Sequence, residues 1–137
     1  MRKLLVVTTL VLFAGIAYGQ TLQKGGIVSI QRFIVTLEPE ITIDQFNEFI
    51  ANKYIPELNK LFEGVKFFTL KGERGEHENS FGRLIWFESE DTRNRYWPEG
   101  GGASDEFTAI QEKLQPLSDE MHKLGTPTVV FTDWLIQ

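Results

Sequence analysis

The feature that most constrains the fold of this chain is the order in which its hydrophobic patterns change along the sequence. Apolar residues that alternate with polar ones mark strands, and apolar residues three and four apart mark helices. From residue 26 onward the patterns run as strand, long helix, strand, strand, long helix, strand. This order is typical of one compact α+β domain built on a single antiparallel sheet.

The four strands are predicted at residues 26–37, 65–71, 81–87 and 128–136. The polar segment 72–80 carries two glycines, which favours a hairpin with a long loop between the second and third strands. Pro127 is expected to precede the last strand, because proline has no N–H for a strand ladder. Both alternating faces of the first strand are largely apolar, so this strand should be covered on both sides.

The first long helix is predicted to begin after Thr42, because Gln45 follows three residues later and completes a capping box. Its apolar positions continue at helical spacing as far as Gly64. Pro56 lies inside this helix and removes one backbone donor, so a kink is expected near residues 52–56.

Two further helices are predicted between the third and fourth strands. Ser89 should cap a short helix that runs to Trp97, and Ser104 should start a long helix that Gly125 ends. The apolar stripe of the long helix is typical of core packing. Pro116 within it predicts a bend.

Two long helices can cover only one face of a four-stranded sheet. We therefore predict an α+β fold: a ferredoxin-like βαββαβ sandwich with an antiparallel four-stranded sheet. The remaining apolar face must meet a second subunit, a ligand or both, because so large an apolar patch is rarely left in water. The sequence thus predicts a homodimer.

The first 19 residues are predicted to be a secretory signal peptide. Arg2 and Lys3 precede an apolar run over residues 4–17, and small residues stand before a cleavage point at Gln20. The run is shorter than the roughly 20 apolar residues that cross a bilayer. We expect a periplasmic or secreted protein with no membrane span after cleavage.

The charge and the cysteine content of the chain after residue 19 limit which partners it can bind and how its fold can be stabilised. Cleavage would leave 12 of the 14 basic residues against 19 acidic ones, a net charge of −7, so nucleic acid is an unsuitable partner. No cysteine is present, and the fold must stand without disulfides. After a short linker at 20–25, residues 26–137 form one predicted domain.

Short motifs spread over this domain resemble those of a known group. They are YIPEL at 54–58, GVK at 64–66, KGERG at 71–75, YWPEG at 96–100 and TDW at 132–134. They resemble the dimeric α+β barrel superfamily, which includes stress-responsive barrel proteins, EthD-like proteins and cofactor-independent antibiotic-biosynthesis monooxygenases. The resemblance implies two sheets that meet across a two-fold axis, with a pocket in each protomer between its sheet and its helices.

Isolated charges and aromatic side chains supply the candidate site residues. Arg83 and Arg32 each interrupt an apolar strand, so each must be paired, reach solvent or meet an anionic ligand. Asp133 on the last strand is the expected salt-bridge partner for either arginine. The predicted ligand-binding residues are Tyr54, Arg83, Trp86, Trp97, His122 and Trp134. His122, Arg83 and Tyr54 are also the candidates for catalysis. The aromatic members fit a core or an interface equally well.

Metal and phosphate sites are not predicted. His77 stands in Glu76-His77-Glu78 within the polar loop, and its spacing matches no metal motif. The glycines at 100–102 follow a helix and lie beside acidic residues, unlike a phosphate loop. No cofactor is expected.

Two functional hypotheses remain open at this point. The aromatic content of the chain, with no motif for chemistry, favours a binding protein for a small, mostly apolar or aromatic molecule. The resemblance alone implies the alternative, a cofactor-independent monooxygenase or related small enzyme. Haem binding or degradation is a subsidiary idea.

Overall fold

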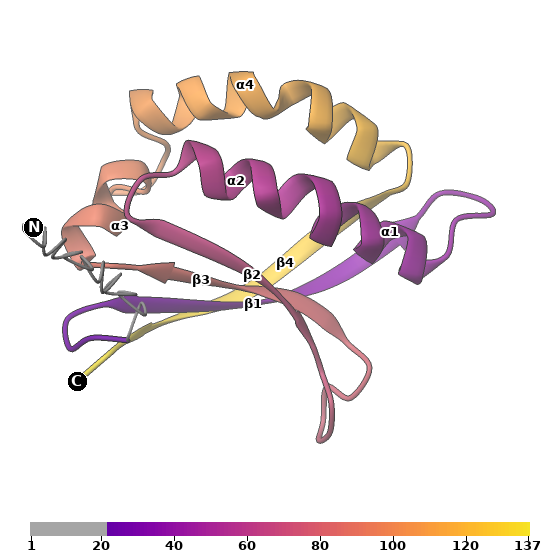
Figure 1. The fold of residues 1–137 in the computed structure, drawn as a ribbon, viewed down its shortest axis with the longest axis horizontal. Coiled ribbons are helices and arrows are strands. Elements are labelled where there is room, and N and C mark those ends of the chain that lie inside the picture. The colour runs from indigo at the N-terminus through magenta and orange to yellow at the C-terminus, as the bar shows by residue number, and fades with distance from the viewer. Residues whose placement is uncertain (1–21) are drawn as a thin grey trace, which may run out of the picture.

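The computed structural model describes residues 22–137 as a four-stranded antiparallel sheet with helices on one face (Figure 1). The expected signal peptide at 1–19 lies outside the described residues. The strands are β1 (Ile27–Leu37), β2 (Val65–Lys71), β3 (Phe81–Phe87) and β4 (Gly125–Leu135), in the spatial order β2-β3-β1-β4. This topology confirms the predicted ferredoxin-like α+β fold.

The first helical segment consists of α1 (Ile43–Phe49), the π-helical turn η1 (Ile50–Tyr54) and α2 (Ile55–Leu61). Its predicted capping box is present, because Gln45 donates its backbone N–H to the Thr42 hydroxyl and the Thr42 backbone N–H bonds the Gln45 side chain. The irregularity expected around Pro56 takes the form of η1, which immediately precedes α2. Proline cannot donate to the carbonyl four residues back, and its ring crowds that carbonyl.

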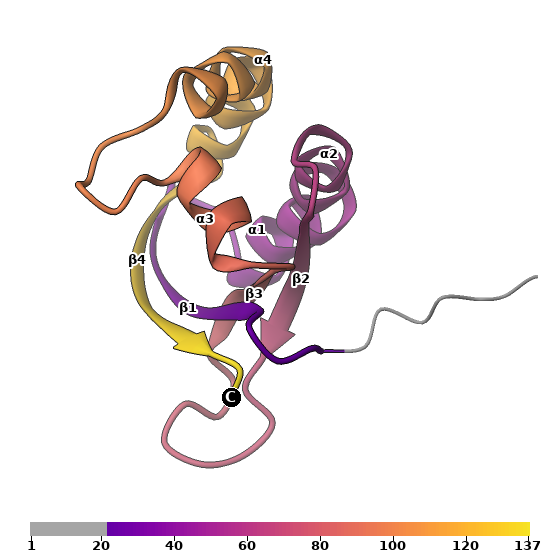
Figure 2. The same ribbon diagram turned by 90° about the vertical axis from the view of Figure 1, so that its left-hand side faces the viewer.

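The second helical segment consists of α3 (Glu90–Tyr96) and α4 (Asp105–His122). Ser89 and Ser104 cap them as predicted, each accepting a backbone N–H in the first turn. α4 continues as one helix through Pro116. Figure 2 shows that the helices share one side of a curved sheet and that α3 lies over the end where β1 begins and β4 ends. No helix in the described part of the chain is long and apolar enough to cross a bilayer.

The core lies between the sheet and these helices and is unusually aromatic. Its side chains come from every layer, and Phe46 and Tyr96 are fully buried within it. The buried hydrophobic residues are Ile27, Phe46, Phe49, Ile50, Ile55, Leu58, Phe62, Val65, Phe67, Ile85, Phe87, Tyr96, Ile110, Leu114 and Met121.

The predicted start of the last strand was wrong. β4 begins at Gly125 and includes Pro127, which lies opposite Val35 of β1. Proline is tolerated there because β4 is at the edge of the sheet, where a missing N–H can face away from the neighbouring strand.

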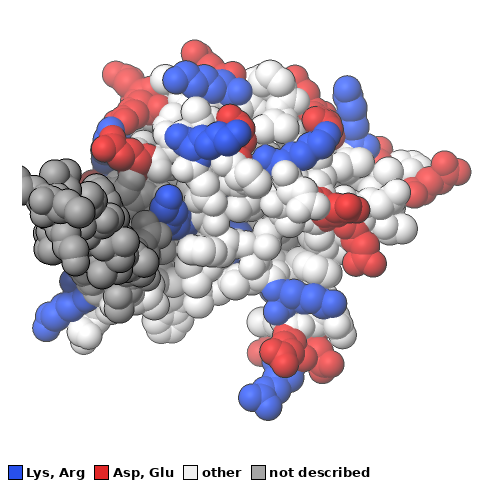
Figure 3. Space-filling view, in the orientation of Figure 1, with Lys and Arg blue, Asp and Glu red and all other residues white. Residues whose placement is uncertain are grey.

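The face of the sheet opposite the helices is largely apolar, although it includes Arg32 and Lys66, and no element in residues 22–137 covers it. Its exposed apolar side chains are Ile30, Ile34, Phe68, Val130 and Trp134. We call this surface the outer face. Figure 3 shows that charged side chains gather over the helices and the β2–β3 loop, while the band between them is mostly uncharged. The uncovered face expected from the alternation pattern is therefore present.

Candidate functional site

A cavity of about 420 Å³ lies between the inner face of the sheet and α3 with the segment that follows it. β1, β3 and β4 form its floor, and α3 and residues 97–99 form its opposite wall. Its lining residues are Ser29, Gln31, Arg83, Ile85, Phe87, Arg93, Trp97, Pro98, Glu99, Phe131 and Asp133. This volume is within the usual range for small-molecule sites, roughly 300–1,000 Å³.

Arg83 is the charged group on the cavity floor. The register of β1 and β3 places it beside Gln31, and its Nε donates a hydrogen bond of 2.5 Å to the Gln31 side-chain oxygen. Gln31 in turn donates to the hydroxyl of buried Ser29 at 3.4 Å. The guanidinium carbon also lies 5.7 Å and 5.9 Å from the ring centroids of Phe33 and Phe67, within the range of cation–π attraction.

The electrostatic setting of Arg83 is unusual. Burial lowers the pKa of Arg83 from its ordinary value, and Tyr54 acts in the opposite direction. The guanidinium stays protonated at neutral pH, because arginine is not deprotonated in proteins. No carboxylate in residues 22–137 forms an ion pair with it. Arg83 is therefore a partly buried positive charge whose contacts in the described residues are two aromatic rings and one amide.

The expected ion pair between Arg83 and Asp133 was wrong. Asp133 pairs with Arg93 of α3 at 3.1 Å, across the side of the cavity. The two side chains are 21% and 29% exposed. The sequence could not show this pairing, because it depends on how α3 lies over β4. Arg93 is thus a cavity residue that the sequence patterns missed.

Aromatic side chains form two walls of the cavity. Trp97 stacks on Phe62, with ring centroids 5.6 Å apart and planes 3° apart. Edge contacts with Phe87 at 5.7 Å and a tilted contact with Phe107 at 4.8 Å fix the indole further. Phe131 lies across the cavity on β4 and is 61% exposed. It was not a predicted site residue, although its alternation places it on the same face as Asp133.

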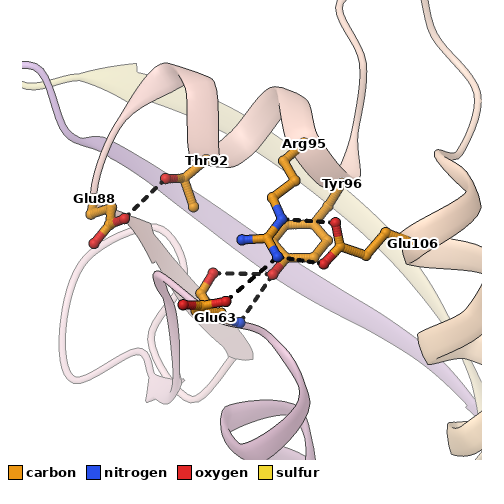
Figure 4. Close-up of polar contacts among 6 residues, drawn as sticks. All are labelled: Glu63, Glu88, Thr92, Arg95, Tyr96 and Glu106. Carbon is orange, nitrogen blue, oxygen red and sulfur yellow. Dashed lines mark hydrogen bonds and ion pairs between the residues drawn. The ribbon is translucent and has the colours of Figure 1, made fainter.

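A polar cluster holds α3 in place beside the cavity (Figure 4). Arg95 donates two hydrogen bonds to the Glu106 carboxylate, at 2.7 and 2.6 Å, which lower the pKa of Glu106. The buried Tyr96 hydroxyl donates to the Glu63 carbonyl at 3.1 Å, and burial raises the pKa of Tyr96. These contacts join α3 to α4 and to the turn after α2.

The structure brings together two of the six predicted ligand-binding residues, Arg83 and Trp97, at this cavity. Trp86 and Trp134 lie on the outer face instead, because both alternate with the inward-facing residues of their strands. Trp134 is 59% exposed there.

The other two predicted residues lie apart from the cavity lining. Tyr54 is half-buried on η1, where it packs against the core. His122 is exposed at the end of α4, and its Nδ1 lies 2.7 Å from the Ser118 carbonyl oxygen. The catalytic roles considered for these residues and for Arg83 remain predictions.

Within residues 22–137, no cluster of three or more His, Cys, Asp or Glu side chains is placed to hold a metal ion. His77 lies in the exposed β2–β3 loop, and its Nδ1 is 3.2 Å from a guanidinium nitrogen of Arg32. Arg32, the second arginine in an apolar strand, thus contacts the exposed β2–β3 loop with its guanidinium.

No family model matches this chain, and no curated protein matches its sequence significantly. Among solved structures it is similar to SnoaB, a cofactor-independent oxygenase from Streptomyces nogalater, with 15% identity and a TM-score of 0.46 over 79% of this chain and 91% of that chain. It is also similar to a dimeric ferredoxin-like protein of unknown function from Bacteroides fragilis, with 14% identity and a TM-score of 0.45 over 82% and 98%. A dimeric ferredoxin-like protein of unknown function from Thermobifida fusca shares 17% identity, with a TM-score of 0.42 over 86% and 97%.

Proposed function

We propose that this protein binds a small aromatic molecule in the cavity between the sheet and α3. The observation that carries the proposal is the composition of the cavity walls, in which aromatic and aliphatic side chains are combined with polar groups that converge on the same space. This combination is typical of sites that recognise one orientation of a small ligand. Trp97 offers a stacking surface, while Gln31 and Arg83 supply donors on the floor.

We also propose that the protein is a homodimer joined through the outer face. Ile30, Ile34 and Val130 are each about half exposed on this face, and a monomer would leave them in water. A two-fold axis brings the same patch of both subunits together and covers both copies at once. The inner cavity would then remain open to ligand from the opposite side of each sheet.

We further propose that residues 1–19 direct the protein out of the cytoplasm. Support comes from the positive start, the apolar run and the small residues before Gln20. Binding would then take place in the periplasm or outside the cell.

Neighbouring residues of β4 provide a matched test of the ligand site. Phe131 lines the cavity, whereas Val130 points to the outer face, and both are more than half exposed. We expect neutral 1-naphthol to bind the wild-type chain with one site per subunit by isothermal titration calorimetry. Phe131→Ala should weaken this binding about tenfold, because an aromatic contact contributes about 0.5–1.5 kcal/mol beyond area burial. Val130→Ala should leave the affinity unchanged.

Three results would count against the proposal. These are no binding of 1-naphthol and related aromatics, binding that Phe131→Ala does not weaken, and equal weakening by both variants. Consumption of oxygen in the same samples would favour the alternative hypothesis, in which the protein is a monooxygenase and not only a binding protein.

A further inference from the structure

The charge on the floor of the cavity is not balanced by the protein. Arg83 has no carboxylate partner in residues 22–137, and residues 1–21 contain neither Asp nor Glu. Its Nε bonds Gln31, but its two Nη atoms make no hydrogen bond to the described residues. A guanidinium carries five N–H donors, so most of its donor capacity remains unused beside the cavity.

The other charges of the cavity do not compensate for Arg83. Asp133 is already paired with Arg93, and Glu99 is an exposed residue at the cavity edge. The floor therefore holds a positive charge without a carboxylate partner in residues 22–137, while the exposed Glu99 carboxylate lies at the edge of the cavity. Such a distribution of charge favours a ligand that has a single negative group and places it on the floor of the cavity.

We propose that the natural ligand is an aromatic monoanion, and that Arg83 binds its carboxylate through the free Nη groups. This inference rests on the proposed function and narrows it from small aromatic molecules to aromatic carboxylates. The planar fork of arginine matches a carboxylate in two parallel hydrogen bonds. A phosphate dianion fits less well, because Asp133 and Glu99 would repel its additional charge.

The same geometry explains the aromatic surroundings of the floor. Phe33 and Phe67 partly stabilise the guanidinium through their ring faces while no ligand is bound. Rings provide no hydrogen-bond acceptor of carboxylate strength, so they leave the donors available. The ring of the ligand would then extend from Arg83 toward Trp97 and Phe131, which line the same cavity.

The test compares two probes of nearly the same shape, 1-naphthoate and the neutral 1-naphthamide, by isothermal titration calorimetry. We expect the wild-type chain to bind 1-naphthoate at least about tenfold more tightly, as a charge-assisted hydrogen bond provides. Arg83→Met should abolish this preference and still bind 1-naphthamide within about twofold of wild type, because methionine keeps the apolar volume. Arg83→Lys should restore part of the preference. Arg74→Met, in the exposed β2–β3 loop, is the control and should change neither affinity.

The outcomes separate this inference from the proposed function. Equal affinity of the wild-type chain for the two probes, or a preference for 1-naphthoate that survives Arg83→Met, would overturn the role of Arg83 while the aromatic site stands. Failure of every aromatic probe to bind the wild-type chain would overturn both. If Arg83→Met does not fold, the ratio of the wild-type affinities for 1-naphthoate and 1-naphthamide tests the proposal by itself.

Discussion

Phe62 packs against four other aromatic rings beside the cavity. It is 4% exposed, and its ring centroid lies 4.8 Å from Tyr96, 5.2 Å from Phe67, 5.6 Å from Trp97 and 6.0 Å from Phe107. Truncation of a buried phenylalanine to alanine costs about 3–5 kcal/mol. Each aromatic pair adds about 0.5–1.5 kcal/mol beyond the area that it buries, so Phe62→Ala should lie at the upper end, at about 5 kcal/mol.

Urea unfolding followed by circular dichroism at one protein concentration would measure this loss. With a slope of about 1.5 kcal/mol/M, the midpoint should fall by roughly 3 M. Ile43→Ala truncates a partly exposed residue at the start of α1 and should cost less than about 1 kcal/mol. A loss of under about 2 kcal/mol for Phe62→Ala would show that the four rings do not depend on Phe62 for their packing.

A milder change links this packing to the site. Phe62→Leu keeps most of the apolar volume and should cost about 1.5 kcal/mol, so the variant should fold. It removes the flat surface on which Trp97 stacks, and the indole should then be held less firmly at the cavity wall. We expect weaker 1-naphthol binding by Phe62→Leu than by wild type.

Two further predictions concern pH and assembly. Because Arg95 lowers the pKa of Glu106 in the folded state, the contribution of Glu106 to stability is complete above its ordinary pKa of 4.5 and is lost as the pH falls through the lowered folded value. The urea midpoints of wild type and Glu106→Gln should therefore differ at pH 7 and converge as the pH falls below 4.5, and a constant difference would contradict the assigned ion pair. Light scattering at tens of micromolar should show a wild-type dimer and an Ile30→Glu monomer, because a carboxylate at the centre of the outer face cannot be buried unpaired, whereas a wild-type monomer would refute the proposed assembly.

Local pattern predicted the fold well because the strands and helices of this chain follow their sequence periods closely. The strands predicted at 65–71 and 81–87 have the bounds of β2 and β3, and the caps at Ser89 and Ser104 marked where α3 and α4 begin. The start of β4 was missed because the acceptability of Pro127 depends on an edge position that only the sheet order reveals.

The site was only partly predictable, for a physical reason. Arg93 and Asp133 are 40 residues apart and meet because α3 is held over the end of β4, which no local pattern encodes. Trp86 and Trp134 were predicted as ligand residues from their type alone, and the alternation of their strands directs them to the outer face. The aromatic content of the sequence predicted an aromatic site. Which aromatic residues line the cavity, namely Trp97 and Phe131, depends on the tertiary fold.

The three tryptophans allow the central claim to be tested in one spectrum. Trp97 lines the cavity, whereas Trp86 and Trp134 lie on the outer face. A titration of the ¹⁵N-labelled chain with 1-naphthoate, followed through the indole N–H signals, reports on all three residues at once. We predict that the Trp97 signal shifts in proportion to occupancy while the other two stay in place. A shift of Trp86 or Trp134 with Trp97 unmoved would place the ligand on the outer face and contradict the proposed site.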